Sequence, residues 1–385
     1  MLIAKRMGSI KSFQVMKLLD RAQALEREGR DIVHMEIGEP DFPTPAAVAE
    51  AGAQFIRAGK IKYTSASGLP ELREAIADYY LRRYGVRPPR RRIFITPGAS
   101  GAFLLAMGAL VNPGDRVLLA DPGYPCYANF VRLFAGKPQS VPVDVDSGFQ
   151  LNSTLLEKYW YRQTAGVVLA SPSNPTGTLI SEGALNEMVG RVERHGGFLI
   201  SDEIYHGLEY GERSHSALEF SDDVFVINSF SKYFGMTGWR LGWLIAPESH
   251  VEALEKLAQN IFISASSASQ AAALAAFGED NLQALERRRL EFQARRDYLC
   301  TELDKLGFDI PLKPKGAFYI YADCTRLSSD SFGFAWRLLE EAHVAVTPGR
   351  DFGENRPDDY LRFSYTTSME RLSLGVERIA GFIAR

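Results

Sequence analysis

Cysteine is scarce in this chain, and long apolar runs are missing. The three cysteines, Cys126, Cys300 and Cys324, are far apart and form no Cys-x-x-Cys pair, so neither a disulfide framework nor a metal site of the zinc type is expected. No run approaches the ~18 apolar residues of a membrane helix, and residues 1–21 carry scattered charges where a signal peptide has an apolar core. We therefore expect a cytoplasmic protein with reduced thiols and no membrane partner.

An excess of charge of one sign is missing as well. The 385 residues include 44 Lys and Arg against 47 Asp and Glu, which gives a net charge of −3 at pH 7. Basic runs occur over residues 87–92 and 287–289, and we interpret them as solvated surface. This balance gives no indication of a nucleic-acid partner. A chain of this length has room for a large core and two domains.

The middle of the chain alternates short apolar runs with helical patterns. Strands are expected at residues 93–95, 117–120, 166–170, 198–201, 224–228 and 241–245. Alternation of strands and helices is typical of a doubly wound, mostly parallel sheet. The sequence therefore predicts the α/β class.

The flanking segments predict a smaller second α/β domain. Before the sheet we expect a helix over 12–29, a strand over 32–37, a helix over 46–58 and a helix from Pro70 to Gly85. After residue 251 we expect a long charged helix over 281–306, strands at 317–322, 343–347 and 360–364, a helix at 331–341 and a final helix from 369. The expected domains are 46–285 (large) and 1–45 plus 286–385 (small).

One stretch, residues 224–243, carries the strongest chemical signal. An apolar run is followed by Ser229, Ser231 and Lys232, and then by Arg240. A lysine at the end of a buried strand has its pKa lowered by desolvation and by a nearby cation, and the neutral amine attacks aldehydes. The two serines and Arg240 are residue types that would bind an anion beside the lysine. An amine beside an anion site fits pyridoxal 5′-phosphate (PLP), although a lysine alone also fits an ordinary solvated position.

Polar side chains follow the other predicted strands too. Ligands of parallel α/β sheets bind beyond the carboxyl ends of the strands. A helix N-terminus offers N–H groups to a phosphate, a tyrosine stacks on an aromatic ring, and a buried carboxylate needs a cation such as a pyridinium. Each position alone also fits a cap, a turn or a packed ring, and Glu203 is expected outside the site. The candidate residues are Ser100, Tyr124, Asn174, Asp202 and Tyr205.

Residues 229–242 closely resemble a known family signature. The stretch Ser-Phe-Ser-Lys-x-x-Gly-Met-x-Gly-Trp-Arg-x-Gly is similar to the lysine signature of the class I/II aminotransferases, the aspartate aminotransferase superfamily of fold type I PLP enzymes. The order of the candidate residues along the chain matches the same family. The resemblance extends from about Gly38 to Arg362.

The resemblance implies a role for each matching residue. Lys232 forms an imine with PLP and carries the proton during catalysis, Asp202 pairs with the pyridinium, and Asn174 and Tyr205 donate to the ring oxygen. Tyr124 stacks on the ring. The phosphate is held by Ala99, Ser100, Ser229 and Arg240.

Three further matches concern the substrate and the assembly. By the resemblance, Arg362 binds the substrate α-carboxylate, Gly38 contacts the same group through its backbone, and Asn174 lies beside it. Tyr63 matches a tyrosine that reaches the phosphate of the neighbouring subunit, which implies a homodimer. The implied reaction is ping-pong transfer of an amino group between an L-amino acid and a 2-oxo acid.

The reaction and the donor stay open at this point. A carbon–sulfur lyase or related elimination enzyme uses the same scaffold. A PLP-binding regulator is a second alternative, although no basic helix-turn-helix pattern occurs before residue 30. Some relatives that use acidic substrates carry a lysine where this chain has Ala99. Aspartate preference is therefore in doubt, and alanine, aromatic or branched donors remain.

Overall fold

The computed structural model describes residues 3–385, and its largest element is a seven-stranded mixed sheet. The strand order is β2–β8–β7–β6–β5–β3–β4. Only β8 runs antiparallel to its neighbours, and the other pairs are parallel. This confirms the predicted α/β fold. The strands are β2 (Ile93–Thr96), β3 (Arg116–Asp121), β4 (Lys137–Pro142), β5 (Thr164–Ala170), β6 (Phe198–Asp202), β7 (Phe225–Ser229) and β8 (Gly242–Ile245).

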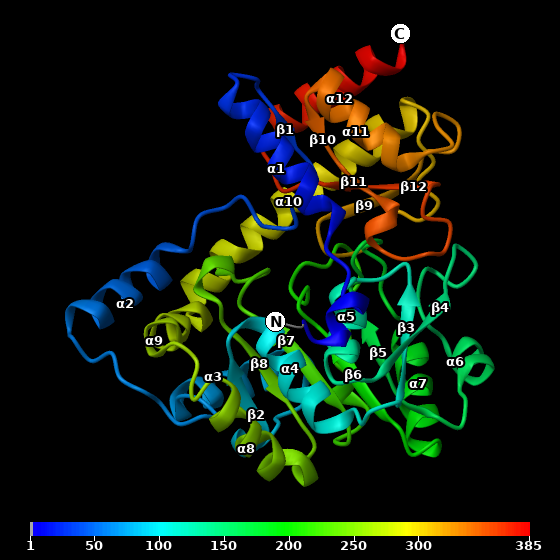
Figure 1. Cartoon of the computed structure of the whole chain (residues 1–385). Helices are drawn as coiled ribbons and strands as arrows, with labels where there is room; N and C mark the ends of the chain where they lie inside the picture. Colours follow the sequence, from blue (N-terminus) through cyan, green and yellow to red (C-terminus); the bar gives the residue numbers. More distant parts are fainter. Residues whose placement is uncertain (1–2) are drawn as a thin grey trace.

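Helices cover both faces of this sheet (Figure 1). Successive strand residues point to opposite faces, so Leu119 and Ile200 enter one core while Leu118 and Leu199 enter the other. The first core is closed by α4 (Gly98–Leu110), α5 (Cys126–Leu133) and α8 (Val251–Ile261). The second is closed by α2 (Ala46–Arg57), α3 (Pro70–Tyr84), α6 (Ser153–Tyr159), α7 (Glu182–Arg194) and α9 (Ser267–Leu274).

A smaller group of elements packs around a separate apolar core that includes Phe308, Leu338 and Phe363. Its sheet has the order β11–β12–β9, and β1 pairs with β10 beside it. The 27-residue helix α10 (Glu279–Lys305) joins the two groups, since Leu285 lies in the core of the large sheet and Leu299 in the smaller core (Figure 1). The remaining elements are α1 (Gln14–Arg27), β1 (Val33–His34), β9 (Tyr319–Asp323), α11 (Ser331–Ala342), β10 (Val344–Ala345), β11 (Thr347–Pro348), β12 (Tyr360–Ser364) and α12 (Met369–Ile383).

Three strands differ from the prediction. β4 was not expected because it contains Pro138 and Pro142, and proline is tolerated only because β4 is the edge strand. The strand expected over 32–37 is only Val33–His34. The strand expected over 343–347 is divided at Val346, because β10 pairs with β1 while β11 pairs with β12.

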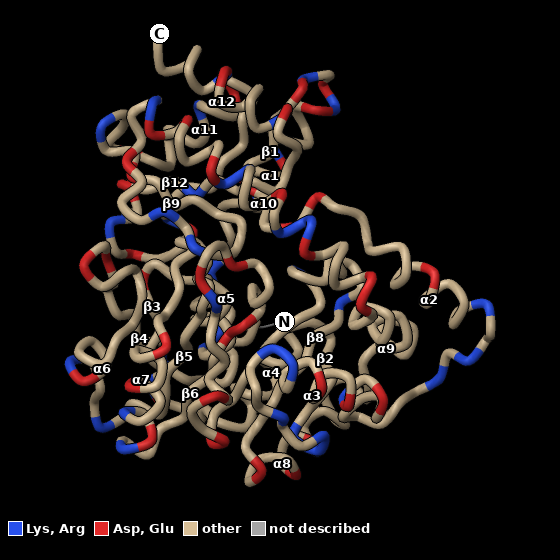
Figure 2. The backbone as a smooth tube through the Cα atoms, turned by 180° about the vertical axis from the view of Figure 1, so that it is seen from behind, with Lys and Arg blue, Asp and Glu red and all other residues tan. Residues whose placement is uncertain are grey.

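Charges of both signs are interspersed along the visible course of the chain (Figure 2). Within residues 3–385 no helix combines the length and the apolar character needed to cross a bilayer.

Candidate active site

A cavity of 330 Å³ is lined by residues at the carboxyl ends of the parallel strands of the large sheet and by residues of the smaller group of elements. Its volume is in the range of small-molecule and cofactor sites. It collects eleven of the twelve residues to which the family resemblance assigns a role, together with Ser231, and Glu203 does not line it. The exception, Tyr63, lies outside the cavity with 81% of its side chain exposed. The eleven are Gly38, Ala99, Ser100, Tyr124, Asn174, Asp202, Tyr205, Ser229, Lys232, Arg240 and Arg362.

Strand order explains why residues far apart in the sequence meet here. β5, β6 and β7 are parallel neighbours, so Asn174, Asp202 and Lys232 follow strand ends that lie side by side. β8 runs antiparallel to these strands, so its first residues lie beside their carboxyl ends. Arg240, which comes just before β8, therefore reaches the same cavity. The end of β2 leads into α4, whose first turn carries Ser100.

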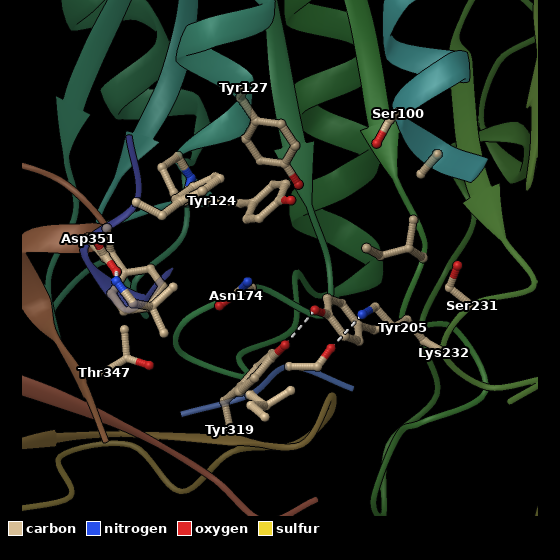
Figure 3. Close-up of a pocket in the computed structure, with 18 of the residues that line it drawn as sticks. Ser100, Tyr124, Tyr127, Asn174, Tyr205, Ser231, Lys232, Tyr319, Thr347 and Asp351 are labelled. Carbon is tan, nitrogen blue, oxygen red and sulfur yellow. Dashed lines mark hydrogen bonds between the residues drawn. The ribbon is translucent and has the colours of Figure 1, made fainter. Parts of the chain in front are cut away.

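Lys232 points its amine into the cavity (Figure 3). Its Nζ donates to the carbonyl oxygen of Gly38 at 2.6 Å. Burial lowers the pKa of Lys232 to about 8; Glu39 opposes that shift, and Arg362 adds to it. A Cβ at position 38 would lie 2.2 Å from the Tyr319 hydroxyl oxygen, so only glycine fits there. The amine is therefore held in place and partly neutral near physiological pH.

Asp202 is a buried carboxylate that forms no ion pair within residues 3–385. The Tyr127 hydroxyl donates to its Oδ2, and the Ile204 N–H donates to its Oδ1 at 3.2 Å. Among the described residues no Lys, Arg or His nitrogen lies within 4.0 Å of this carboxylate. Burial raises the pKa of Asp202 to about 6, and the bond from Tyr127 opposes the shift. Such a group favours a cationic partner inside the cavity.

The start of α4 and Arg240 form an anion cradle. Gly98 has φ +69°, and a Cβ there would lie 2.6 Å from Arg240 Nη2, so the helix N-terminus packs directly on the guanidinium. Arg240 donates to the Thr237 carbonyl at 3.1 Å and forms no ion pair with a carboxylate of residues 3–385. The Ser229 and Ser231 hydroxyls are 2.9 Å apart beside it. A helix N-terminus, hydroxyls and an unpaired guanidinium together suit a phosphate.

Arg362, like Arg240, forms no ion pair with a carboxylate of residues 3–385. Its Nη1 donates to Asn174 Oδ1 at 3.0 Å, and its Nη2 donates to the Glu36 carbonyl at 2.5 Å. The guanidinium lies 4.2 Å from the centre of the Tyr319 ring. Its buried Nε has no hydrogen-bond partner within the described part of the chain. The planar guanidinium is therefore positioned to bind a carboxylate by donating hydrogen bonds to it.

Sequence reasoning missed several cavity residues. Tyr127, in the first turn of α5, is the partner of Asp202, and no sequence motif marks it. Tyr319, whose hydroxyl is 3.0 Å from that of Tyr205, carries no motif. Asp351 carries no motif either. The wall formed by α1 and the residue that precedes it was also missed, because an amphipathic pattern predicts that one face of a helix is buried but not which surface that face packs against. The wall residues are Phe13, Val15, Met16 and Leu19.

Comparisons with known proteins agree with this geometry. The model of the family "Aminotransferase class I and II" matches residues 30–379. A (5-formylfuran-3-yl)methyl phosphate transaminase of Methanocaldococcus jannaschii is 37% identical over 99% of this chain and 100% of its own. A valine–pyruvate aminotransferase of Mycobacterium tuberculosis is 36% identical over 99% of this chain and 98% of its own. A solved aminotransferase structure from Mycobacterium tuberculosis has a TM-score of 0.96 at 36% identity and covers 100% of this chain and 99% of that one.

The chain belongs to the class I and II aminotransferases, a family of PLP-dependent enzymes. It is an aminotransferase that moves an amino group between an L-amino acid and a 2-oxo acid, which confirms the prediction from the lysine signature. The similarities give no support to the lyase and regulator alternatives.

Proposed function

We propose that the cavity of this chain binds PLP and performs ping-pong transamination there. When bound, PLP supplies the electron sink that makes the Cα–H bond of an amino acid acidic. Lys232 is the covalent anchor, Asp202 is the counter-ion of the pyridinium, and Tyr124 covers the ring. Ala99, Ser100, Ser229 and Arg240 hold the phosphate. The donor set fits this cofactor because the cavity offers both an unpaired buried carboxylate and an anion cradle.

Two hydrogen-bond donors are oriented by contacts within the chain. Asn174 uses its Oδ1 as the acceptor for Arg362, which leaves its amide N–H groups to donate to the cofactor ring oxygen. Burial raises the pKa of Tyr205 well above its usual value, so the phenol keeps its proton and can donate to the same oxygen.

Lys232 and Arg362 divide the work on the substrate. Arg362 binds the α-carboxylate, and Gly38 and Asn174 lie beside that group. The free Lys232 amine takes the proton from the substrate Cα and would deliver it to the cofactor carbon C4′, so that the amino group can be transferred. The lowered pKa leaves a substantial neutral fraction of the amine near pH 8, the form a general base needs. Arg362 and Gly38 belong to the proposed small domain of residues 1–45 plus 286–385. Lys232, Asn174 and the residues proposed to hold the cofactor belong to the proposed large domain, 46–285. Closure of the small domain would orient the substrate and exclude water.

We also propose a cytoplasmic homodimer. Tyr63 lies outside the cavity of its own chain, and Ile56 and Ile61, near it in the sequence, are also exposed large apolar residues. A second copy of the chain would cover these residues and receive Tyr63 at its phosphate cradle. The free thiols Cys126, Cys300 and Cys324 support the cytoplasm as the compartment.

The single observation that carries the proposal is that the Lys232 amine and the buried Asp202 carboxylate line the same cavity. The test is the absorption spectrum of the PLP-loaded protein as amino acids are added singly without an acceptor. We expect the visible band of lysine-bound PLP to be replaced by the near-ultraviolet band of pyridoxamine 5′-phosphate. Lys232→Ala should abolish the visible band, whereas Lys256→Ala, at an exposed lysine, should retain it. A visible band that persists in Lys232→Ala would refute the assignment.

A further inference from the structure

The N-terminal segment supplies an apolar wall of the cavity. Phe13, Val15, Met16 and Leu19 line the cavity from α1 and the residue that precedes it. The Phe13 ring stacks on the Tyr124 ring, with centroids 6.5 Å apart and an interplanar angle of 19°. Ring and aliphatic carbon thus face the space that remains once the cofactor and the α-carboxylate are accommodated.

Asp351 fixes this wall in place. Its two carboxylate oxygens accept the N–H groups of Gln14 and Val15, each at 2.6 Å, which caps the first turn of α1. Figure 3 shows Asp351 across the cavity from Lys232. Within residues 3–385 no cation lies within 4.0 Å of Asp351. A second substrate carboxylate on this side would meet a negative charge and apolar carbon.

Each cationic side chain that lines the cavity already has a role in the proposed function. They are Lys232, Arg240 and Arg362, which the proposed function assigns to the proton, the phosphate and the α-carboxylate. Ala99 adds no charge. None of the cavity-lining residues in the described chain is left to neutralise a distal carboxylate.

We infer that the enzyme selects amino acids with a bulky apolar side chain, aromatic or branched, which packs against the wall formed by Phe13, Val15, Met16 and Leu19. Aspartate and glutamate are poor donors because their distal carboxylate would be desolvated without a counter-ion. This inference rests on the proposed function. It names the substrate class of that site and the residues that select it.

The first test compares donors and unreactive acids on the PLP-loaded enzyme. Donor half-reactions are followed by stopped-flow absorbance with leucine, phenylalanine, aspartate and glutamate, and binding of 3-phenylpropanoate and glutarate is measured by calorimetry. We expect leucine or phenylalanine to exceed both acidic donors by on the order of 100-fold in kcat/KM, and 3-phenylpropanoate to bind more tightly than glutarate. Acidic donors within tenfold of the best apolar donor would overturn the inference.

The binding measurement separates the two proposals. If no donor changes the spectrum but 3-phenylpropanoate is still preferred, transamination at this site fails while the apolar selectivity stands. If glutarate binds as tightly as 3-phenylpropanoate, the selectivity fails whatever the donors do.

A variant pair tests the wall itself. Met16→Lys places an ammonium group on the lining, and Gln23→Lys places the same group on an exposed position of α1 that does not line the cavity. Met16→Lys should raise the kcat/KM of glutamate about tenfold and tighten glutarate binding to match, and Gln23→Lys should change neither. The inference is wrong if Met16→Lys leaves both unchanged. It is also wrong if wild-type enzyme prefers glutamate and Lys62→Ala, beside Tyr63, removes that preference, since a second copy would then supply the cation.

Discussion

The two sides of the cavity are built in different ways. Asp202 and Ser229 are the last residues of the neighbouring strands β6 and β7, where backbone ladders fix their positions, and Asn174 follows the end of β5. The opposite wall is a single helix, α1, held at its start by Asp351. The sheet edge therefore suits bond-making chemistry, which needs fixed geometry. The helix can vary in sequence without disturbing that geometry, which suits the selection of a substrate.

The sheet side should be the more sensitive to substitution, and Asp202→Asn tests it first. The variant keeps the shape but removes the charge that we assign to the pyridinium. Breaking a buried charge pair costs about 3–5 kcal/mol, so kcat/KM should fall roughly 150- to 5,000-fold. Steady-state kinetics with the best donor measures the loss.

Spectroscopy supplies the control for this variant. The visible band of lysine-bound PLP should persist in Asp202→Asn because Lys232 is unchanged. A fall of less than tenfold in kcat/KM would show that Asp202 is not the charge partner.

Arg362→Lys has the next largest expected effect and acts on the binding of the substrate α-carboxylate. Lysine keeps the positive charge but cannot reproduce the fork that contacts Asn174 and the Glu36 carbonyl. Losing a hydrogen bond to a charged group costs about 1.5–3 kcal/mol, so donor kcat/KM should fall roughly 10- to 150-fold. An unchanged kcat/KM would contradict the carboxylate role. Arg350→Lys, at an exposed arginine outside the cavity lining, is the matched control.

Asp351→Ala should have a smaller effect, confined to the α1 side. The first turn of α1 loses both of its acceptors. Loss of a helix cap costs about 1–2 kcal/mol, so the KM of an apolar donor should rise roughly 5- to 30-fold with little change in kcat. Asp358→Ala, which removes an ion pair outside the cavity lining, should leave KM unchanged. A fall in kcat at constant KM would instead place Asp351 in the chemistry.

The same contrast explains what could be predicted from the sequence. Lys232, Asp202 and Asn174 were located because parallel strand ends share an edge, and that inference needs only strand positions. The wall was not predicted. The contacts of Asp351 with Gln14 and Val15 join positions more than 300 residues apart, and no local pattern encodes them.

The smallest expected effect compares one titrating group on each side, the buried Glu203 and the partly exposed His34. Behind the sheet edge, Glu203 accepts hydrogen bonds from Ser201, Ser216 and the Ala217 N–H. Burial raises the pKa of Glu203 from 4.5 to about 8. Near α1, His34 bonds to Glu36 at 2.7 Å, and that bond raises the pKa of His34 from 6.5 to about 9.

Both shifts make the folded protein less stable as the pH rises. Folded Glu203 keeps a proton that the unfolded chain releases above pH 4.5, so its stabilisation is lost as the pH approaches 8. His34 acts in the same direction between pH 6.5 and 9, but its side chain is 26% exposed and solvent screens it. Between about pH 6.5 and 7.5, Glu203 alone should lower the free energy of unfolding by about 1 kcal/mol. Urea unfolding at these two pH values should show a slope that Glu203→Gln reduces more than His34→Gln does. The opposite order would mean that the bond between His34 and Glu36 shifts the pKa of His34 by more than burial shifts the pKa of Glu203.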